Sequence, residues 1–232
     1  MSIRIDSLTK RFGDQLLFDG ISLDIEQGGL TALIGGSGCG KTTLLRIVAG
    51  LSRPDAGYIR LNGYDLQASP RNALAQLSFL PQAPRFHARL TTRQVLHYYA
   101  RLRNRSTDEA EEELARWALT EHARHRTADL SGGLRQRLAL AICALARAPL
   151  FVLDEPGLSL DPHWRARLQE FLAEEAARGA TVLVATHLLG EWEGRADRAF
   201  VLEHGAVARE APVDALRDAL VVRASERPPL PR

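Results

Sequence analysis

The sequence is poor in lysine and cysteine and has no long apolar run. Of its 30 basic residues only Lys10 and Lys41 are lysines, and its two cysteines, Cys39 and Cys143, stand far apart. No CxxC or Cys/His spacing suggests a metal centre, and nothing indicates an oxidising compartment. No stretch approaches the roughly 20 apolar residues of a membrane helix, and no signal-peptide core follows the N-terminus. We therefore expect a cytoplasmic protein, with any membrane-spanning part supplied by a partner.

The sequence also lacks internal repeats and a strong net charge. Its 232 residues are 45% hydrophobic and 25% charged, with a net charge of +2, as in an ordinary globular protein. We attribute the arginine excess to coding bias and expect no nucleic-acid partner. Without a repeat, the chain is predicted to form one domain rather than a tandem pair. Because the chain uses arginine almost exclusively, a lysine at a position whose chemistry requires lysine indicates a functional role.

One glycine-rich stretch organises the rest of the chain. Its residues are Gly35, Gly36, Ser37, Gly38, Cys39, Gly40, Lys41, Thr42 and Thr43. The part from Gly35 to Thr42 fits G-x-x-x-x-G-K-[ST], a phosphate-binding pattern. An apolar run over residues 30–34 precedes the stretch, and a helical pattern over residues 44–49 follows it. This strand, loop and helix context favours a phosphate site over an ordinary glycine turn.

The chemistry of the loop follows from its residue types. Glycines let successive backbone N–H groups point into one cavity, and the helix N-terminus adds a positive dipole end there. Lys41 would reach the β- and γ-phosphates, and the Thr42 hydroxyl would ligate Mg²⁺. The loop alone does not distinguish kinases, GTPases and transport ATPases.

Two further predicted strands end in polar residues. Residues 150–153 lead into Asp154 and Glu155, and residues 181–185 lead toward His187. Ligands of open α/β sheets bind beyond the carboxyl ends of strands, so these side chains should meet the glycine loop at one edge. Asp154 would hold Mg²⁺, and Glu155 would position and deprotonate a water. Without the loop, a plain strand-to-loop junction would explain the same residues.

The remaining patterns predict further strands and helices. Alternation predicts strands at residues 3–5, 21–25, 58–61 and 77–80, with a turn at Lys10–Gly13, and a final hairpin near residues 200–207. Helices are predicted over residues 92–102, 108–119 with Thr107 as the cap, 134–148 and 164–178. Residues from 223 onward are predicted to form a disordered tail.

A second glycine-containing surface is predicted at residues 130–137. Ser131, Gly132 and Gly133 stand at a helix start, where backbone N–H groups attract anions. They lie too far along the chain to belong to the first loop, and one nucleotide rarely needs two such surfaces. Two copies arranged head to tail would place each second surface on the γ-phosphate held by the other copy.

This ordered series resembles the ATP-binding subunit of an ABC transporter over residues 1–222. The matching motifs are Gly35–Thr42 as Walker A, Gln82 as the Q-loop, Leu130–Gln136 as the signature, Leu150–Glu155 as Walker B, Leu158–Asp161 as the D-loop and His187 as the switch histidine. The resemblance implies an α/β P-loop NTPase (RecA-like) core, a small antiparallel β subdomain and an α-helical signature subdomain at about residues 83–147. Residues 223–232 would form a Pro-rich tail.

The resemblance also implies roles for single residues, with ATP and Mg²⁺ as cofactors. Phe12 would stack on adenine, and Gln82 would contact Mg²⁺ and the attacking water. Glu155 would be the general base, and His187 would brace the water and the γ-phosphate. Asp161 would lie across the interface between two copies.

Three positions depart from the family pattern. Leu134 replaces the usual Gln of the signature, Gly157 the usual Thr after Glu-Pro, and Leu158 the usual Ser of the D-loop. None of these changes removes a ligand or the base, so we expect an active ATPase. Their effect on turnover stays open.

The resemblance predicts a subunit that drives a membrane permease from the cytoplasmic face of the inner membrane. ATP would close two copies into a dimer, and hydrolysis would reopen it, with a permease helix docked near residues 82–90. A soluble ABC ATPase for cofactor or metal-site assembly is the alternative. Residues 90–102 look like those of exporters, whereas residues 37–41 suit importers equally, so we favour export. The cargo depends on the permease.

Overall fold

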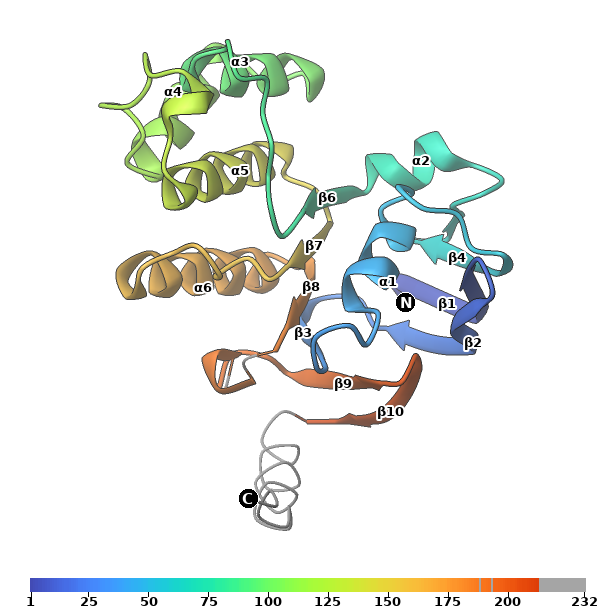
Figure 1. Cartoon of the computed structure of the whole chain (residues 1–232). Helices are drawn as coiled ribbons and strands as arrows, with labels where there is room; N and C mark the ends of the chain where they lie inside the picture. Colours follow the sequence, from blue (N-terminus) through green and yellow to red (C-terminus); the bar gives the residue numbers. More distant parts are fainter. Residues whose placement is uncertain (188, 193, 213–232) are drawn as a thin grey trace.

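A six-stranded sheet, in the order β10-β9-β3-β8-β7-β6, lies at the centre of the chain (Figure 1). The computed structural model describes residues 1–187, 189–192 and 194–212, and the predicted tail at 223–232 lies outside them. The strands are β3 (Gly29–Ile34), β6 (Leu77–Leu80), β7 (Leu150–Asp154), β8 (Thr181–Thr186), β9 (Arg198–Glu203) and β10 (Ala206–Ala211). Pairing is parallel from β9 to β6, and β10 closes one edge as the antiparallel arm of the predicted hairpin.

Alternating side chains give the sheet two apolar faces. Phe151 and Leu153 of β7 join one buried cluster, whereas Leu150 and Val152 join another. The first face is covered by α5 (Gly132–Ala146) and α6 (Pro162–Ala177), and the second by α1 (Lys41–Val48) (Figure 1). A parallel sheet buried on both faces requires such continuous apolar strands, which is why these short runs were recognisable in the sequence.

A smaller antiparallel sheet packs on the α1 side. Its order is β2-β1-β4-β5, formed by β1 (Ile3–Phe12), β2 (Gln15–Ile25), β4 (Ala56–Leu61) and β5 (Tyr64–Asp65), and α2 (Pro70–Ala75) follows it. The predicted turn at Lys10–Gly13 is wrong in part. Residues 10–12 pair with β2 as strand, so the turn is confined to Gly13 and Asp14.

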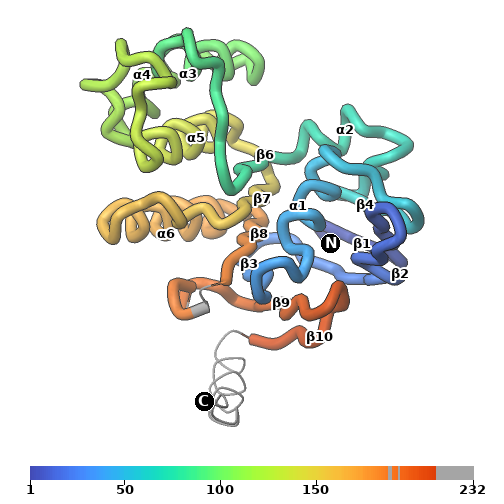
Figure 2. Tube along the Cα trace, viewed as in Figure 1, coloured from blue at the N-terminus to red at the C-terminus, as the bar shows by residue number. Residues whose placement is uncertain are grey.

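Two helices lie beyond α5, away from the central sheet (Figures 1 and 2). They are α3 (Thr92–Leu102) and α4 (Thr107–Arg116), and two short 3₁₀ segments lie at Thr127–Asp129 and Leu189–Trp192. The prediction that Thr107 caps α4 is wrong. Ser106 accepts from the Glu109 N–H while the Glu109 carboxylate accepts from the Ser106 N–H, a capping box that starts the helix one residue earlier.

Candidate nucleotide site

The glycine loop joins the end of β3 to the start of α1. Gly38 and Gly40 have φ values of +81° and +109°, which lie in the region that favours glycine. A Cβ on Gly40 would lie 2.7 Å from the Phe18 ring, so no side chain fits there. Gly40 is the N-cap of α1 and supplies no capping side chain. The loop therefore offers backbone donors and an open helix N-terminus to an anion.

Lys41 places a cation inside this loop. It begins α1 and is only 7% exposed. Its Nζ donates to the carbonyl oxygens of Gly35 at 2.7 Å and of Gly36 at 3.3 Å. A buried ammonium requires such acceptors. The bonds hold the charge where phosphate oxygens would meet the loop.

Asp154 ends β7 beside the first turn of α1. Burial raises the pKa of its carboxyl, a hydrogen bond from Thr42 opposes that shift, and the charge of Glu155 adds to it. Its Oδ1 is buried and has no hydrogen-bond partner among the described residues. A hard cation with oxygen ligands would satisfy this atom, and the neighbouring Thr42 hydroxyl supplies a second ligand of the same kind. The donor set therefore fits Mg²⁺.

Glu155 follows in a conformation that is unusual for a glutamate. Its φ is +46°, its backbone N–H donates to the Ala185 carbonyl at 2.9 Å, and its Oε1 lies 2.9 Å from Nδ1 of His187. Non-glycine residues hold such a φ only where surrounding contacts fix it, and these positions cluster at functional sites. Two strand ends thus fix one carboxylate.

Lys41, Thr42 and Glu155 line one cavity of about 280 Å³. Its lining residues are Leu17, Ser37, Gly38, Gly40, Lys41, Thr42, Thr43, Gln82 and Glu155. Cation, hydroxyls, amide and carboxylate therefore face the same volume, at the carboxyl edge of the sheet. Leu17, on β2, was missed in the sequence, where a single apolar residue in an alternating strand gives no sign of a site.

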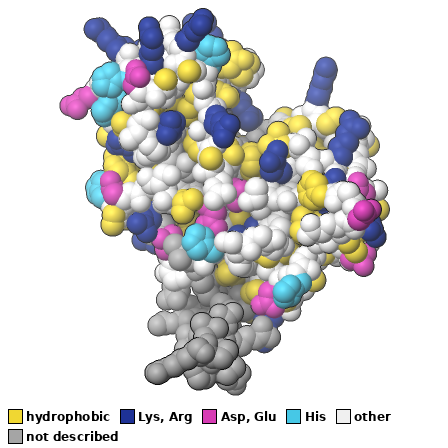
Figure 3. Space-filling model, in the orientation of Figure 1, with side chains coloured by type: hydrophobic (Ala, Val, Ile, Leu, Met, Phe, Trp, Pro, Cys, Tyr) yellow, Lys and Arg dark blue, Asp and Glu magenta, His cyan; other side chains and the backbone are white. Residues whose placement is uncertain are grey.

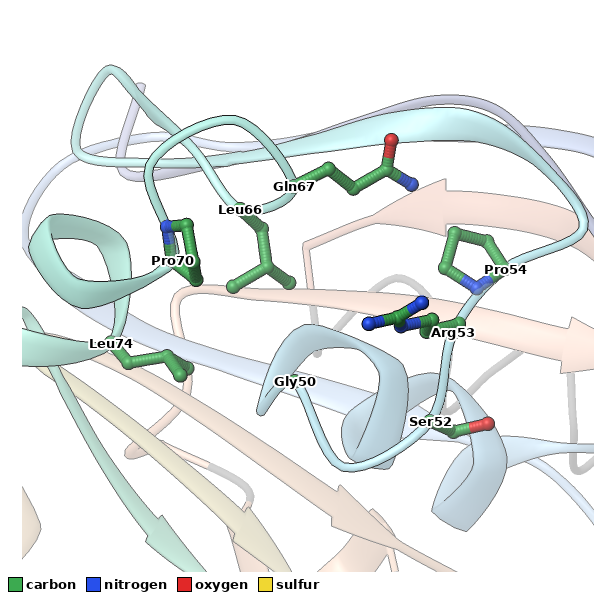
Figure 4. A pocket seen from close by; sticks show the side chains of 8 residues that line it. All are labelled: Gly50, Ser52, Arg53, Pro54, Leu66, Gln67, Pro70 and Leu74. Atoms are coloured by element: carbon green, nitrogen blue, oxygen red, sulfur yellow. The ribbon is translucent and has the colours of Figure 1, made fainter.

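Another cavity, of about 440 Å³, lies between the end of α1 and α2 (Figure 4). Leu66, Pro70 and Leu74 lie on one side of it, and Arg53 is the only charged side chain in its lining. None of its lining residues lies at the end of a strand of the central sheet. Its lining has no lysine and no carboxylate, whereas the glycine-loop cavity has both.

The other predicted residues lie outside the glycine-loop cavity. Phe12 is 55% exposed, with the Lys10 Nζ 5.2 Å from its ring centroid. Ser131 caps α5 by accepting from the Leu134 N–H, and Asp161 caps α6 by accepting from the Trp164 N–H. The structure of one copy therefore gathers the loop, strand-end and Gln82 groups but leaves the second glycine surface apart.

That second surface borders a cavity of about 560 Å³. Gly132 and Gln82 both line it, together with Leu158 and Ser159. Gln82 thus lines two neighbouring cavities, of which only one contains Lys41.

The three departures from the family pattern have different surroundings. Leu134 is partly buried against the apolar cluster of α5 and α6. A Cβ on Gly157 would meet Arg165 at 3.4 Å, an ordinary contact, so a side chain fits there. Leu158 is 55% exposed.

Fold and site together define a P-loop nucleoside triphosphatase. A glycine loop between a buried parallel strand and a helix holds the lysine, and strand β7, separated from β3 by β8, brings the Asp–Glu pair to the same edge of the sheet.

Comparison with known proteins places the chain more closely. The ABC transporter family profile matches residues 18–157. The chain is 34% identical over 220 residues to the daunorubicin resistance ATP-binding protein DrrA3 of Streptomyces coeruleorubidus, covering 93% of the chain and 70% of that protein. It is 36% identical over 222 residues to the Nod factor export ATP-binding protein I of Rhizobium sp. (strain N33), covering 93% and 72%. The chain belongs to the ABC transporter family, as an ATP-binding subunit.

Solved structures agree on the fold. An ATP-binding subunit of an ABC transporter superposes with a TM-score of 0.87 at 29% identity, covering 96% of this chain and 95% of that one. A dimeric ATP-binding cassette in a post-hydrolysis state with ADP and Pi superposes with a TM-score of 0.82 at 24% identity, covering 91% and 98%. These matches confirm the predicted P-loop NTPase fold.

Membership of this family makes the chain an ATPase that uses ATP with Mg²⁺. It also implies a dimer and a membrane component as partners. Among the helices of the described residues, the longest is α6 with 16 residues, and none combines the length and apolar character of a bilayer span.

Proposed function

We propose that this chain is the ATP-hydrolysing subunit of an ABC exporter and works as a head-to-tail dimer on an integral-membrane partner. The observation that carries the proposal is the cavity in which Lys41, Thr42 and Glu155 face one volume. Phosphate binding, metal binding and proton abstraction each need one of these three groups, at hydrogen-bond range of the same ligand.

In this proposal different residues of one copy bind the phosphates, hold the metal and accept the proton. The loop N–H groups and Lys41 bind the phosphates, and Thr42, Asp154 and Gln82 hold Mg²⁺. When bound, Mg²⁺ would neutralise charge on the phosphate oxygens. Glu155 accepts the proton of the attacking water, and His187 holds that carboxylate in place and braces the γ-phosphate.

A second copy would complete the site. Ser131, Gly132 and Gly133 stand outside the catalytic cavity of their own chain, at an α5 N-terminus that suits an anion. Head-to-tail pairing would set them on the γ-phosphate of the other copy, with Asp161 at the interface and Phe12 stacked on adenine. The dimeric cassettes among the solved structures support a dimer.

The membrane partner would dock between the part of the chain formed by α3 to α5 and the part that contains α1 and α2. A cavity of about 300 Å³ lies between β6 and the helices α3 and α5, with Phe86, Tyr99 and Leu102 among its lining residues. The space-filling surface is indented between the lobe of α3 to α5 and that of α1 and α2 (Figure 3). A short amphipathic helix of the permease would fit this apolar groove. Gln82, which follows Pro81 of its lining, would carry the signal to the catalytic cavity.

Export is favoured by the relatives. One is named for drug resistance and others for Nod factor export. The chain would then act at the cytoplasmic face of the inner membrane, with residues 1–222 as one ATPase domain and residues 83–147 as its helical part. The permease would select the cargo.

The test is Glu155→Gln, which keeps the shape of the side chain but removes the base. ATP turnover should fall by about 10²–10⁴-fold, the usual contribution of a general base. An ATP-bound dimer should accumulate and be visible by sedimentation. The matched control is Glu112→Gln, an exposed glutamate on α4, which should turn over ATP normally. Normal turnover in Glu155→Gln would refute the assignment of the base.

A further inference from the structure

Gln136 is a buried polar residue on α5, the helix whose N-terminus carries Ser131, Gly132 and Gly133. It is 1% exposed, and its Nε2 donates to the backbone oxygen of Pro156 at 2.8 Å. The other buried residues of α5 are apolar: Leu138, Ala139, Leu140, Ala141, Cys143, Ala144 and Leu145. Burying an amide is costly unless it is hydrogen-bonded. Packing alone would favour an apolar side chain here, so the bond to Pro156 explains the glutamine.

That bond acts on the turn that carries Glu155. The Glu155 N–H donates to the Ala185 carbonyl, and the Glu155 carbonyl accepts from the Leu158 N–H at 3.2 Å. Gln136 holds the next carbonyl along the chain. A glutamate at φ +46° is strained and persists only when its neighbours fix it from several sides. Gln136 supplies the contact from the α5 side.

The start of α5 touches the same segment at two more points. A Cβ on Gly133 would lie 3.1 Å from the Ser159 carbonyl oxygen, so the two backbones approach closely there. The Arg137 guanidinium lies 4.4 Å from the Trp164 ring centroid, a cation–π distance. Residues 155–164 and the first turns of α5 are therefore fastened together and should move as one body.

We infer that Gln136 is a positioning residue that sets the orientation of Glu155 and links it to the Ser131 surface. The inference rests on the proposed function of Glu155 as the base. When Ser131 and Gly133 engage the nucleotide of a second copy, any shift of α5 passes through Gln136 to the Pro156 carbonyl. The base of one site thus responds to the ligand of the other.

The test is Gln136→Met, which keeps the length of the side chain and a good helix former but removes the donor. It should lower kcat about tenfold or more, while KM for ATP and the affinity for a fluorescent ATP analogue stay within about twofold. Leu145→Ala, at the far end of α5, is the stability control, because it leaves a cavity without touching the turn. It should lower the melting temperature yet keep the kcat of the folded protein.

A second variant separates the bond from packing. In Gln136→Glu a protonated carboxyl donates to Pro156, whereas a carboxylate does not. Its activity relative to wild type should therefore rise as the pH falls.

Wild-type kcat in Gln136→Met, an equal loss in Leu145→Ala, or a pH-independent ratio for Gln136→Glu would each overturn the inference while leaving the proposed function intact. A wild-type protein without ATP turnover would instead refute the proposed function.

Discussion

Nδ1 of His187 lies 2.9 Å from Oε1 of Glu155 and joins the ends of two neighbouring strands. In the sheet register Asp154 of β7 is paired with Ala185 of β8, so Glu155 and His187, which follow the two strands, lie close together. The Glu155 side chain is 11% exposed and that of His187 is 42% exposed. The proposed base is thus held by an imidazole ring that is open to solvent.

His187→Ala should impair catalysis far more than stability. Loss of the partner frees the carboxylate, and kcat should fall about 10–100-fold with little change in ATP affinity. A partly exposed pair contributes only about 0–1 kcal/mol, so the melting temperature should hardly move. Steady-state kinetics and thermal unfolding check both. His125→Ala, at an exposed histidine between α4 and α5, should behave as wild type. An unchanged kcat in His187→Ala would show that His187 does not position Glu155.

Asp154→Asn should stabilise the protein without nucleotide and abolish its response to Mg²⁺. Burial raises the pKa of Asp154 above its ordinary 3.8. The folded state therefore binds the Asp154 proton more tightly than the unfolded state does. Protonated Asp154 contributes its full stabilisation below pH 3.8, and this stabilisation is lost as the pH rises through the folded-state pKa. At neutral pH the ionised group is unfavourable, and the variant should gain about 1 kcal/mol, or about 2–4 °C.

The measurement for this variant is thermal unfolding with and without Mg²⁺ and ATP. Wild type should overtake Asp154→Asn once both ligands are present, and the gain of the variant should vanish in acid. The exposed Asp19→Asn serves as the control. Equal Mg²⁺-dependent stabilisation of the variant and wild type would remove Asp154 from the metal site.

The two cysteines should differ in reactivity. Burial raises the pKa of Cys143 to about 11, whereas Cys39 is half-buried in the glycine loop. Because the thiolate is the reactive form, native protein at pH 8 should expose one thiol to alkylation and denatured protein two. ATP with Mg²⁺ should slow labelling of Cys39. Mass spectrometry of labelled peptides would show this, and a Cys143 that reacts as fast as Cys39 would contradict the structure.

Much of the fold could be predicted from the sequence, because buried parallel strands are short apolar runs with polar residues at their ends. Residues 150–153 and 181–185 gave both the central sheet and the position of Asp154, Glu155 and His187 beside the glycine loop. The glycine loop itself was readable because only glycine suits the φ values at Gly38 and Gly40.

Other features depend on contacts between distant segments and left no local signal. Leu17 lines the cavity only because β2 passes under the loop. The bond from Gln136 to Pro156 joins residues 20 positions apart. The cap of α4 was misplaced because Ser106 and Thr107 are both good caps, and only the observed backbone shows which one accepts the bond.

We propose that one catalytic site uses the glycine loop of one copy and the Ser131 surface of another. Cys39 offers a natural thiol in the loop, so Ser131→Cys supplies the second thiol. Cys143→Ala removes the other cysteine, and Glu155→Gln keeps ATP bound. Mild oxidation with ATP and Mg²⁺ should then produce a disulfide-linked dimer. Omitting ATP, or adding Cys39→Ser, should prevent it. A bridge formed within one chain, or an unlinked protein in the presence of ATP and Mg²⁺, would contradict the two-copy site.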